Sequence, residues 1–251
     1  MARTSWMTWL LTLTTLVVWC ITAYQVALAA GARSFRAIIL NVLSNAQNAD
    51  VLISFGAKDN SAILAGQYWR FVTPIFLHAN ILHVGLNMLN LLVLGIFIER
   101  LFGHARFLLI YLVTGVISVI ASFYLAPQEI SVGASGAIFG LVGAYSIFVL
   151  AHRRALRYAG IPALLWLVIV IGVNLSIGFF VPDIDNYAHI GGLLSGCILG
   201  WEFTPLYILF PKKGNRQLTD VHNLSRRWPL ALLTIGVTLL LAFLAIHFVG
   251  G

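Results

Sequence analysis

The sequence carries very little charge. Charged residues make up 9% of its 251 positions, against about 25% in soluble domains, while 60% are hydrophobic and the mean hydropathy is +0.94. These values exclude a soluble enzyme and a disordered chain. The net charge of +7 does not indicate nucleic-acid binding, because the basic residues lie in clusters between apolar runs. We therefore expect a polytopic membrane protein with no nucleic-acid partner.

Cysteine is also scarce. Cys20 and Cys197 both lie inside apolar runs, so there is no disulfide framework and no metal-type cysteine pair. His78 and His83 are five residues apart, about 140° round a helix, which does not suit one metal ion. Carboxylates at a matching depth are lacking as well. The sequence predicts no metal and no cofactor.

Apolar runs define the expected fold. A spanning helix needs about 20 mostly apolar residues. Seven segments qualify, at about 6–29, 80–98, 106–126, 134–151, 161–181, 187–209 and 229–249. We expect one all-α membrane domain over residues 1–251, with its core at about 6–209 and an extra C-terminal helix. The first run is too long for a signal peptide and is expected to remain as a helix. The connection at 30–79 mixes apolar and polar residues, so it should lie partly in the membrane interface.

The basic residues predict the orientation. With the N-terminus inside, 11 of the 15 Lys and Arg residues fall on the inner side, and the other four fall in the long first loop. The positive-inside rule therefore predicts an inner N-terminus and an outer C-terminus. The inner residues are Arg3, Arg100, Arg106, Arg153, Arg154, Arg157, Lys212, Lys213, Arg216, Arg226 and Arg227.

Polar groups gather at the expected outer ends of three helices. Ser135 lies in Gly133-Ala134-Ser135-Gly136 at a helix start, where the glycines let a substrate carbonyl approach and free N–H groups can stabilise an oxyanion. His189 precedes a row of small residues, Gly192-x3-Gly196-x3-Gly200, which matches Gly136-x3-Gly140-x3-Ala144. If the two rows meet, Ser135 and His189 come together as parts of an acyl-transfer site.

Each feature has a plainer explanation. Serine in a membrane helix often bonds its own backbone, and small-residue rows occur in membrane proteins without chemistry. His83 and Asn87 share a helix face and can donate to an oxyanion, or they can form a polar clamp between helices. Asp185 and Asp183 precede His189 and could orient it, but Pro182 makes that segment loop-like. We interpret both acids as polar residues of an outer loop.

Taken together, the motifs resemble the rhomboid family of intramembrane serine proteases. Trp69-Arg70 followed by His78-x4-His83-x3-Asn87 is similar to the family's W-R and H-x4-H-x3-N signatures. Gly133-Ala134-Ser135-Gly136 resembles its G-x-S-G motif. Ala188-His189-x2-Gly192-x3-Gly196 resembles its A-H-x2-G-x3-G motif. The resemblance covers about residues 50–205 and implies a six-helix bundle plus a seventh transmembrane helix.

The resemblance also implies roles for single residues. Ser135 would be the nucleophile and His189 the general base, in a dyad without a third acid. His83, Asn87 and the Ser135 N–H would bind the oxyanion.

Other residues would support the site. His78 would shape it from the loop side, while Trp69 and Arg70 would anchor the first loop. Glu99 and Arg100 resemble a structural E-R pair. Phe139 stands where many members have a tyrosine stacked on the histidine, so the ring is kept and the hydroxyl is lost.

The expected function is therefore intramembrane endopeptidase activity on single-span membrane proteins. The expected location is the cell (inner) membrane, with the site open to the extracytoplasmic side and lipids as neighbours. A catalytically inactive rhomboid-like protein that binds membrane clients is one alternative. A small-solute transporter is another, but we find no internal repeat that would support it.

Overall fold

The computed structural model describes most of the chain. The described residues are 4–44, 47–156, 162, 165–166, 169, 171–173, 176, 184–212 and 215–250. The span expected at 161–181 lies largely outside them, so its existence and position stay a prediction.

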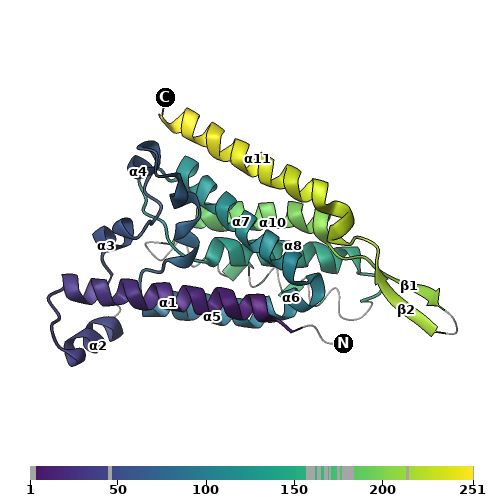
Figure 1. Cartoon of the computed structure of the whole chain (residues 1–251), viewed down its shortest axis with the longest axis horizontal. Coiled ribbons are helices and arrows are strands. Elements are labelled where there is room, and N and C mark those ends of the chain that lie inside the picture. Colours follow the sequence, from purple (N-terminus) through teal and green to yellow (C-terminus); the bar gives the residue numbers. More distant parts are fainter. Residues whose placement is uncertain are drawn as a thin grey trace.

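Helices make up most of the described chain, and several of them are long and apolar (Figure 1). The helix α1 spans Trp6–Ala29, α7 spans His104–Leu125 and α11 spans Leu224–Gly250. A further helix runs from α5 (Ile81–Asn90) through a π-helical turn, η3 (Leu91–Gly95), into α6 (Ile96–Phe102). Among the described residues, these four segments are long and apolar enough to cross a membrane. The protein is a polytopic helical membrane protein, as its composition predicted.

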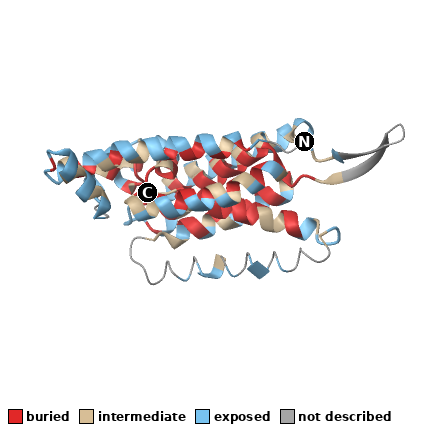
Figure 2. Ribbon diagram, turned by 90° about the horizontal axis from the view of Figure 1, so that it is seen from below, coloured by how far each residue is buried: buried red, intermediate tan, exposed pale blue. Residues whose placement is uncertain are grey.

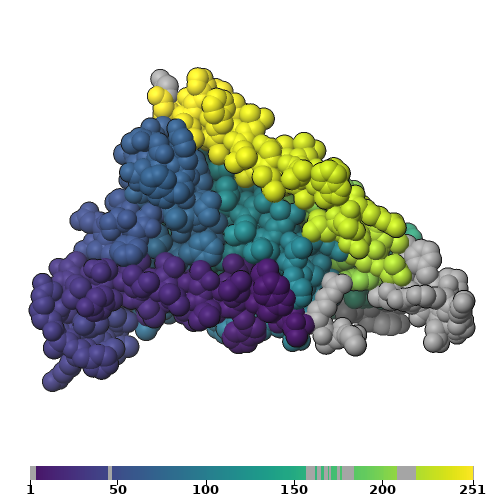
Figure 3. Space-filling model, viewed as in Figure 1, coloured from purple at the N-terminus to yellow at the C-terminus, as the bar shows by residue number. Residues whose placement is uncertain are grey.

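Two shorter helices complete the centre of the fold. The helices α8 (Ser135–Ala151) and α10 (Asn186–Phe203) pack against each other and against α7. In Figures 1 and 3, α1 lies along one side of this centre and α11 along the opposite side. Buried residues gather in the centre and exposed ones line the outside (Figure 2). Large apolar side chains such as Leu13, Val93 and Phe243 are exposed on the outer helices, as a lipid-facing surface requires.

The first loop is folded against the bundle. It contains α2 (Phe35–Leu43), α3 (Ala49–Ser54), α4 (Asn60–Leu64) and two 3₁₀ turns, η1 (Tyr68–Phe71) and η2 (Thr73–Phe76). Each of the three α-helices starts with a polar side chain that accepts a backbone N–H three residues on. These caps are Ser34, Asn48 and Asp59. The helix α2 buries none of its residues, so its place in the membrane interface stays a prediction.

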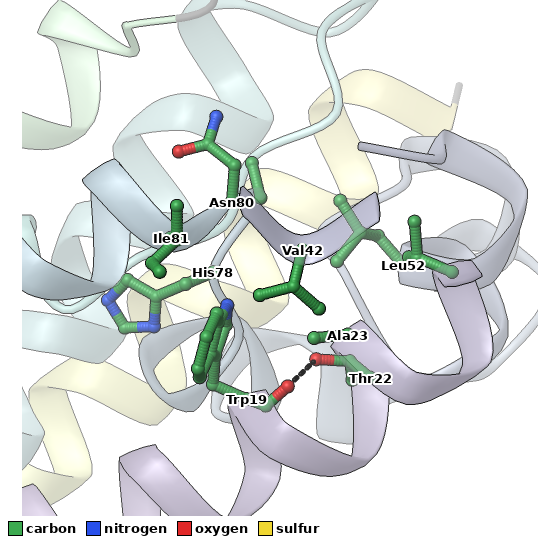
Figure 4. Close-up of a pocket in the computed structure, with 10 residues that line it drawn as sticks. Trp19, Thr22, Ala23, Val42, Leu52, His78, Asn80 and Ile81 are labelled. Carbon is green, nitrogen blue, oxygen red and sulfur yellow. Dashed lines mark hydrogen bonds between the residues drawn. The ribbon is translucent and has the colours of Figure 1, made fainter. Parts of the chain in front are cut away.

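The loop meets α1 around a small pocket (Figure 4). Trp19 and Thr22 of α1 lie opposite His78 and Asn80, and the Thr22 hydroxyl donates to the Trp19 carbonyl over 3.0 Å. The cavity volume is about 10 Å³, at the lower limit for holding one water molecule. Packing here is therefore close, and His78 is only 1% exposed.

The C-terminal end of α10 differs from the sequence-based expectation. The predicted helix 187–209 is too long, because α10 ends at Phe203 and an antiparallel hairpin follows. Its strands are β1 (Tyr207–Lys212) and β2 (Asn215–Asp220). Pro205 lacks a backbone N–H and disfavours helical backbone at the preceding residue, which accounts for the early end. The last helix also begins at Leu224, earlier than the predicted 229, with Pro229 inside it.

A buried acid joins α6 to α1. The Glu99 side chain is 0% exposed and accepts N–H bonds from Met7 at 3.0 Å and Thr8 at 2.8 Å, in the first turn of α1. The Thr8 hydroxyl donates to it over 2.6 Å, and His104 lies 2.5 Å away. A carboxylate is favourable at the N-terminus of a helix. Arg100 is exposed, so the structural contacts of the E-R pair come from Glu99.

Candidate active site

Two rows of glycines let α8 and α10 touch backbone to backbone. A methyl group added to Gly192 would overlap the Gly136 carbonyl, and one added to Gly196 would overlap that of Gly140. The expectation that the two rows meet is therefore confirmed. Their contact sets the relative position of the two helix starts.

A polar row on α7 packs against the same glycines. Ser118 lies against Gly136, and Thr114 lies against Gly140. Both hydroxyls donate to carbonyls of their own helix over 2.7 Å, so neither of these two groups is left unpaired against α8. Sequence reasoning missed this contribution. The signal was present, because Thr114, Ser118 and Ser122 recur every four residues and share one helix face.

The helix starts bring Ser135 to His189. Ser135 is the first residue of α8, and His189 lies in the first turn of α10. The Ser135 Oγ is 2.8 Å from the His189 Nε2, a hydrogen-bonding distance. His189 is 8% exposed and Ser135 is half-buried. The helix bundle shields the pair, but the Ser135 side remains partly exposed.

The ring of Phe139 packs on the imidazole of His189. The two ring centroids are 4.5 Å apart and their planes differ by 20°, which is a stacked arrangement. Phe139 lies one helical turn after Ser135, so α8 supplies both the hydroxyl and the ring that faces the imidazole. Stacking restricts the tilt of the imidazole without adding a hydrogen bond to it.

Among the described residues, no acid contacts the far side of the imidazole. The His189 Nδ1 is buried and has no hydrogen-bond partner among them. The Asp185 carboxylate instead accepts the Ala188 N–H over 2.9 Å and caps α10. Asp183 lies outside the described residues. The described geometry is thus that of a serine–histidine pair, with Asp185 as a helix cap.

Gly133 lies between His83 and Ser135. Its φ is +127°, a conformation that L side chains rarely adopt, and its N–H donates to the Pro74 carbonyl over 2.9 Å. A Cβ built on Gly133 would be 2.8 Å from His83 Nε2 and 3.7 Å from Ser135 Oγ. A methyl group here would crowd the His83 imidazole and approach the Ser135 hydroxyl. Glycine therefore keeps the gap between these two side chains open.

Asn87 and His78 both contact His83. Asn87 is buried on α5, and its amide donates one N–H to the His83 carbonyl over 3.0 Å. An amide carries two N–H groups, so one is left for a ligand. The rings of His78 and His83 meet edge to face with centroids 5.0 Å apart. Burial, with the nearby His83 as a smaller cause, lowers the pKa of His78 to about 3, so its neutral ring accepts the Ala134 N–H over 3.4 Å.

Arg70 holds the first loop together. Its guanidinium is buried and donates to the carbonyls of Ile53 and Ala57, each over 2.8 Å, and to the Gln67 side chain. The Trp69 side chain is 57% exposed and makes no comparable contact. The geometry of Arg70 agrees with an anchoring role, and Trp69 faces outward.

Fold and site together define a class of protein. It is a helical membrane protein in which a serine and a histidine from two helices meet at the helix starts. The family model described as Rhomboid domain matches residues 65–205, more than half of the chain. The chain belongs to the rhomboid family.

Curated relatives agree with this assignment. The chain is 45% identical to Rhomboid protease GluP of Bacillus subtilis (strain 168) over 159 residues, which are 63% of this chain and 30% of GluP. It is 38% identical to the mitochondrial RHOMBOID-like protein 6 of Arabidopsis thaliana over 168 residues, 66% of this chain and 53% of the relative. It is 34% identical to Putative rhomboid protease YdcA of Bacillus subtilis (strain 168) over 143 residues, 57% of this chain and 70% of YdcA. The chain thus covers less than two thirds of the first two relatives.

Proposed function

We propose that this protein is an intramembrane serine endopeptidase that uses a Ser135–His189 dyad. The observation that carries the proposal is the 2.8 Å separation of Ser135 Oγ and His189 Nε2. A serine hydroxyl is a weak nucleophile and needs an adjacent base to activate it. Membership of a family with protease-named relatives supports the same reaction class.

The proposed reaction has two stages. In the first, Ser135 attacks a peptide carbonyl while His189 takes the hydroxyl proton and passes it to the leaving amine. In the second, His189 activates a water molecule that attacks the acyl-enzyme and frees the serine. Phe139 keeps the imidazole in position through both stages.

The gap between Gly133, His83 and Ser135 is the proposed site for the oxyanion. The His83 Nε2 lies on one side of this gap and the Ser135 Oγ on the other, because a Cβ on Gly133 would approach both atoms. The second N–H of Asn87 and the backbone N–H groups of Ser135 and Gly136 at the start of α8 are further candidate donors. Donors aimed at a developing charge contribute about 2.7–4 kcal/mol each to the transition state.

We propose single-span membrane proteins as substrates. The carbonyls of a wound helix are engaged in hydrogen bonds, so cleavage needs a segment that unwinds easily. The proposed orientation, from the basic residues, opens the site to the extracytoplasmic side of the cell membrane. Lipids would be the immediate neighbours of the exposed apolar faces.

Cleavage in liposomes tests the proposal. Purified protein is combined with a panel of single-span model substrates, and wild type is compared with Ser135→Ala and His189→Ala. Wild type should cleave at least one substrate, and both variants should be inactive while still folding. A Ser135→Ala protein that cleaves as fast as wild type would refute the dyad.

The alternative is an inactive relative that binds membrane clients. The plant relatives are named only rhomboid-like, which leaves this alternative open. A serine-reactive fluorophosphonate separates the two functions. Labelling that depends on Ser135 favours the protease, whereas client binding without labelling favours the alternative.

A further inference from the structure

Lys58 is a buried cation that the proposed mechanism does not use. Its side chain is 0% exposed, and its Nζ donates to the carbonyls of Ala126 over 2.6 Å and Glu129 over 2.8 Å. Its backbone also pairs with Ser131 through two hydrogen bonds of 3.0 and 3.3 Å. One residue of the first loop thus holds three points of the connection between α7 and α8.

This connection, residues 126–134, leads directly to Ser135. At its far end the Gly133 N–H is held by the Pro74 carbonyl, and the Ala134 N–H is held by His78. Lys58 fixes the rest of it. The path of the backbone into Gly133, and with it the start of α8, therefore depends on where Lys58 holds the connection.

The charge of Lys58 suits this position. Ala126 is the C-terminal cap of α7, and a cation is favourable beside the carbonyl end of a helix. The acidic groups that face Lys58 are Asp59 from its own loop, Glu129 from the connection and Asp185 from the start of α10. Asp185 caps the helix that carries His189, so Lys58 is linked electrostatically to that helix and through hydrogen bonds to the connection before Ser135.

Burial opposes the charge of Lys58, and the carboxylates favour it. Burial is the larger effect, and it lowers the pKa of Lys58 from 10.5 to about 8. The side chain is therefore mostly protonated below this pH and mostly neutral above it. Hydrogen bonds from an ammonium group to carbonyls are roughly twice as strong as those from a neutral donor, so the hold on the connection weakens as pH rises.

We propose that Lys58 is a positioning residue for the Ser135–His189 pair. Lys58 holds the connection to α8 in its active arrangement only while its ammonium group carries a charge. The inference rests on the proposed function. Lys58 does not touch the substrate site, so its loss should lower kcat and leave KM nearly unchanged.

The test uses the full-length protein in detergent and in liposomes. The rate of fluorophosphonate labelling of Ser135, and kcat and KM for a single-span substrate, are measured between about pH 6 and pH 10. Wild type is compared with Lys58→Met, Lys58→Arg and Asp185→Asn, and circular dichroism checks that each protein folds. Asparagine still caps a helix, so Asp185→Asn removes the charge and keeps the cap. Glu129→Gln is the control for surface charge, because Glu129 binds Lys58 through its backbone carbonyl.

The expected results separate charge from packing. Lys58→Met should slow labelling and lower kcat about tenfold or more at neutral pH, with KM within about twofold. Wild type should lose activity above about pH 8, whereas Lys58→Arg should not, because arginine keeps its charge. Asp185→Asn should move the alkaline loss to lower pH, since a favourable negative charge is gone, and Glu129→Gln should move it less.

Two results would overturn the inference. One is a Lys58→Met protein labelled at the wild-type rate, and the other is the same alkaline loss in wild type and Lys58→Arg. If Lys58→Met does not fold, the pH profiles of kcat and of labelling for Lys58→Arg and Asp185→Asn test the inference instead. Wild-type protein that is never labelled would refute the proposed function, and this inference with it.

Discussion

Replacing Gly133 by alanine tests the proposed oxyanion site most directly. The new methyl group would lie 2.8 Å from His83 Nε2 and 3.7 Å from Ser135 Oγ, so it would crowd His83 and narrow the gap proposed for the substrate oxygen. Losing one good oxyanion donor costs about 2.7–4 kcal/mol, which is about 10²–10³ in kcat. Strained backbone at a φ of +127° would add about 1–3 kcal/mol of instability. We therefore expect a folded protein with kcat reduced at least about 100-fold.

The backbone cost has a matched control. Gly66 in the first loop has a φ of +96°, and a Cβ there would meet no atom within 4 Å. Gly66→Ala therefore carries a similar backbone strain without touching the site. The assay is steady-state cleavage in liposomes beside thermal unfolding in detergent. If Gly133→Ala and Gly66→Ala have equal kcat, the space beside Gly133 does not hold the oxyanion.

Three further substitutions probe the stacking, the helix contact and the buried acid. Phe139→Leu keeps an apolar side chain but removes the stacked ring. Steady-state kinetics should therefore give a several-fold lower kcat with unchanged KM. An unchanged kcat would show that stacking does not orient the imidazole. Gly196→Leu would push α10 away from Gly140, and thermal unfolding should show a loss of about 3 kcal/mol; a stable, active variant would contradict the tight helix contact. Glu99→Gln removes the negative charge that α6 places at the start of α1. It should lower the free energy of unfolding by about 1–3 kcal/mol and leave kcat per folded molecule unchanged. Full stability with lost activity would argue against the structural role.

The parts of the fold that the sequence predicted depend on local patterns. The apolar run at 6–29 coincides with α1, and 134–151 lies within one residue of α8, because run length and composition mark a membrane helix. The contact of α8 with α10 was also predictable, since small residues at every fourth position are visible in the sequence. The proximity of Ser135 and His189 followed from that contact.

Other features depend on partners that leave no mark in the sequence. The burial of Lys58 could not be predicted from the sequence, because its partners are backbone carbonyls that any residue could supply. The hairpin after Phe203 was missed because the apolar character continues through Tyr207 and Ile208, and hydropathy alone does not separate helix from strand. The amide of Asn87 was expected to face a substrate, but one of its N–H groups is used within its own helix.

The backbone contact between α8 and α10 also bears on how the protein can move. A joint formed by interlocking side chains can shift when rotamers change, but glycines offer no rotamers to change. The separation of the Ser135 hydroxyl and the His189 imidazole is therefore fixed when the protein folds. The entropy cost of orienting the two groups is part of the free energy of folding and not of substrate binding. In the proposed protease, any movement that admits a peptide must then occur in the elements around the contact of α8 and α10, while Ser135 and His189 stay in place.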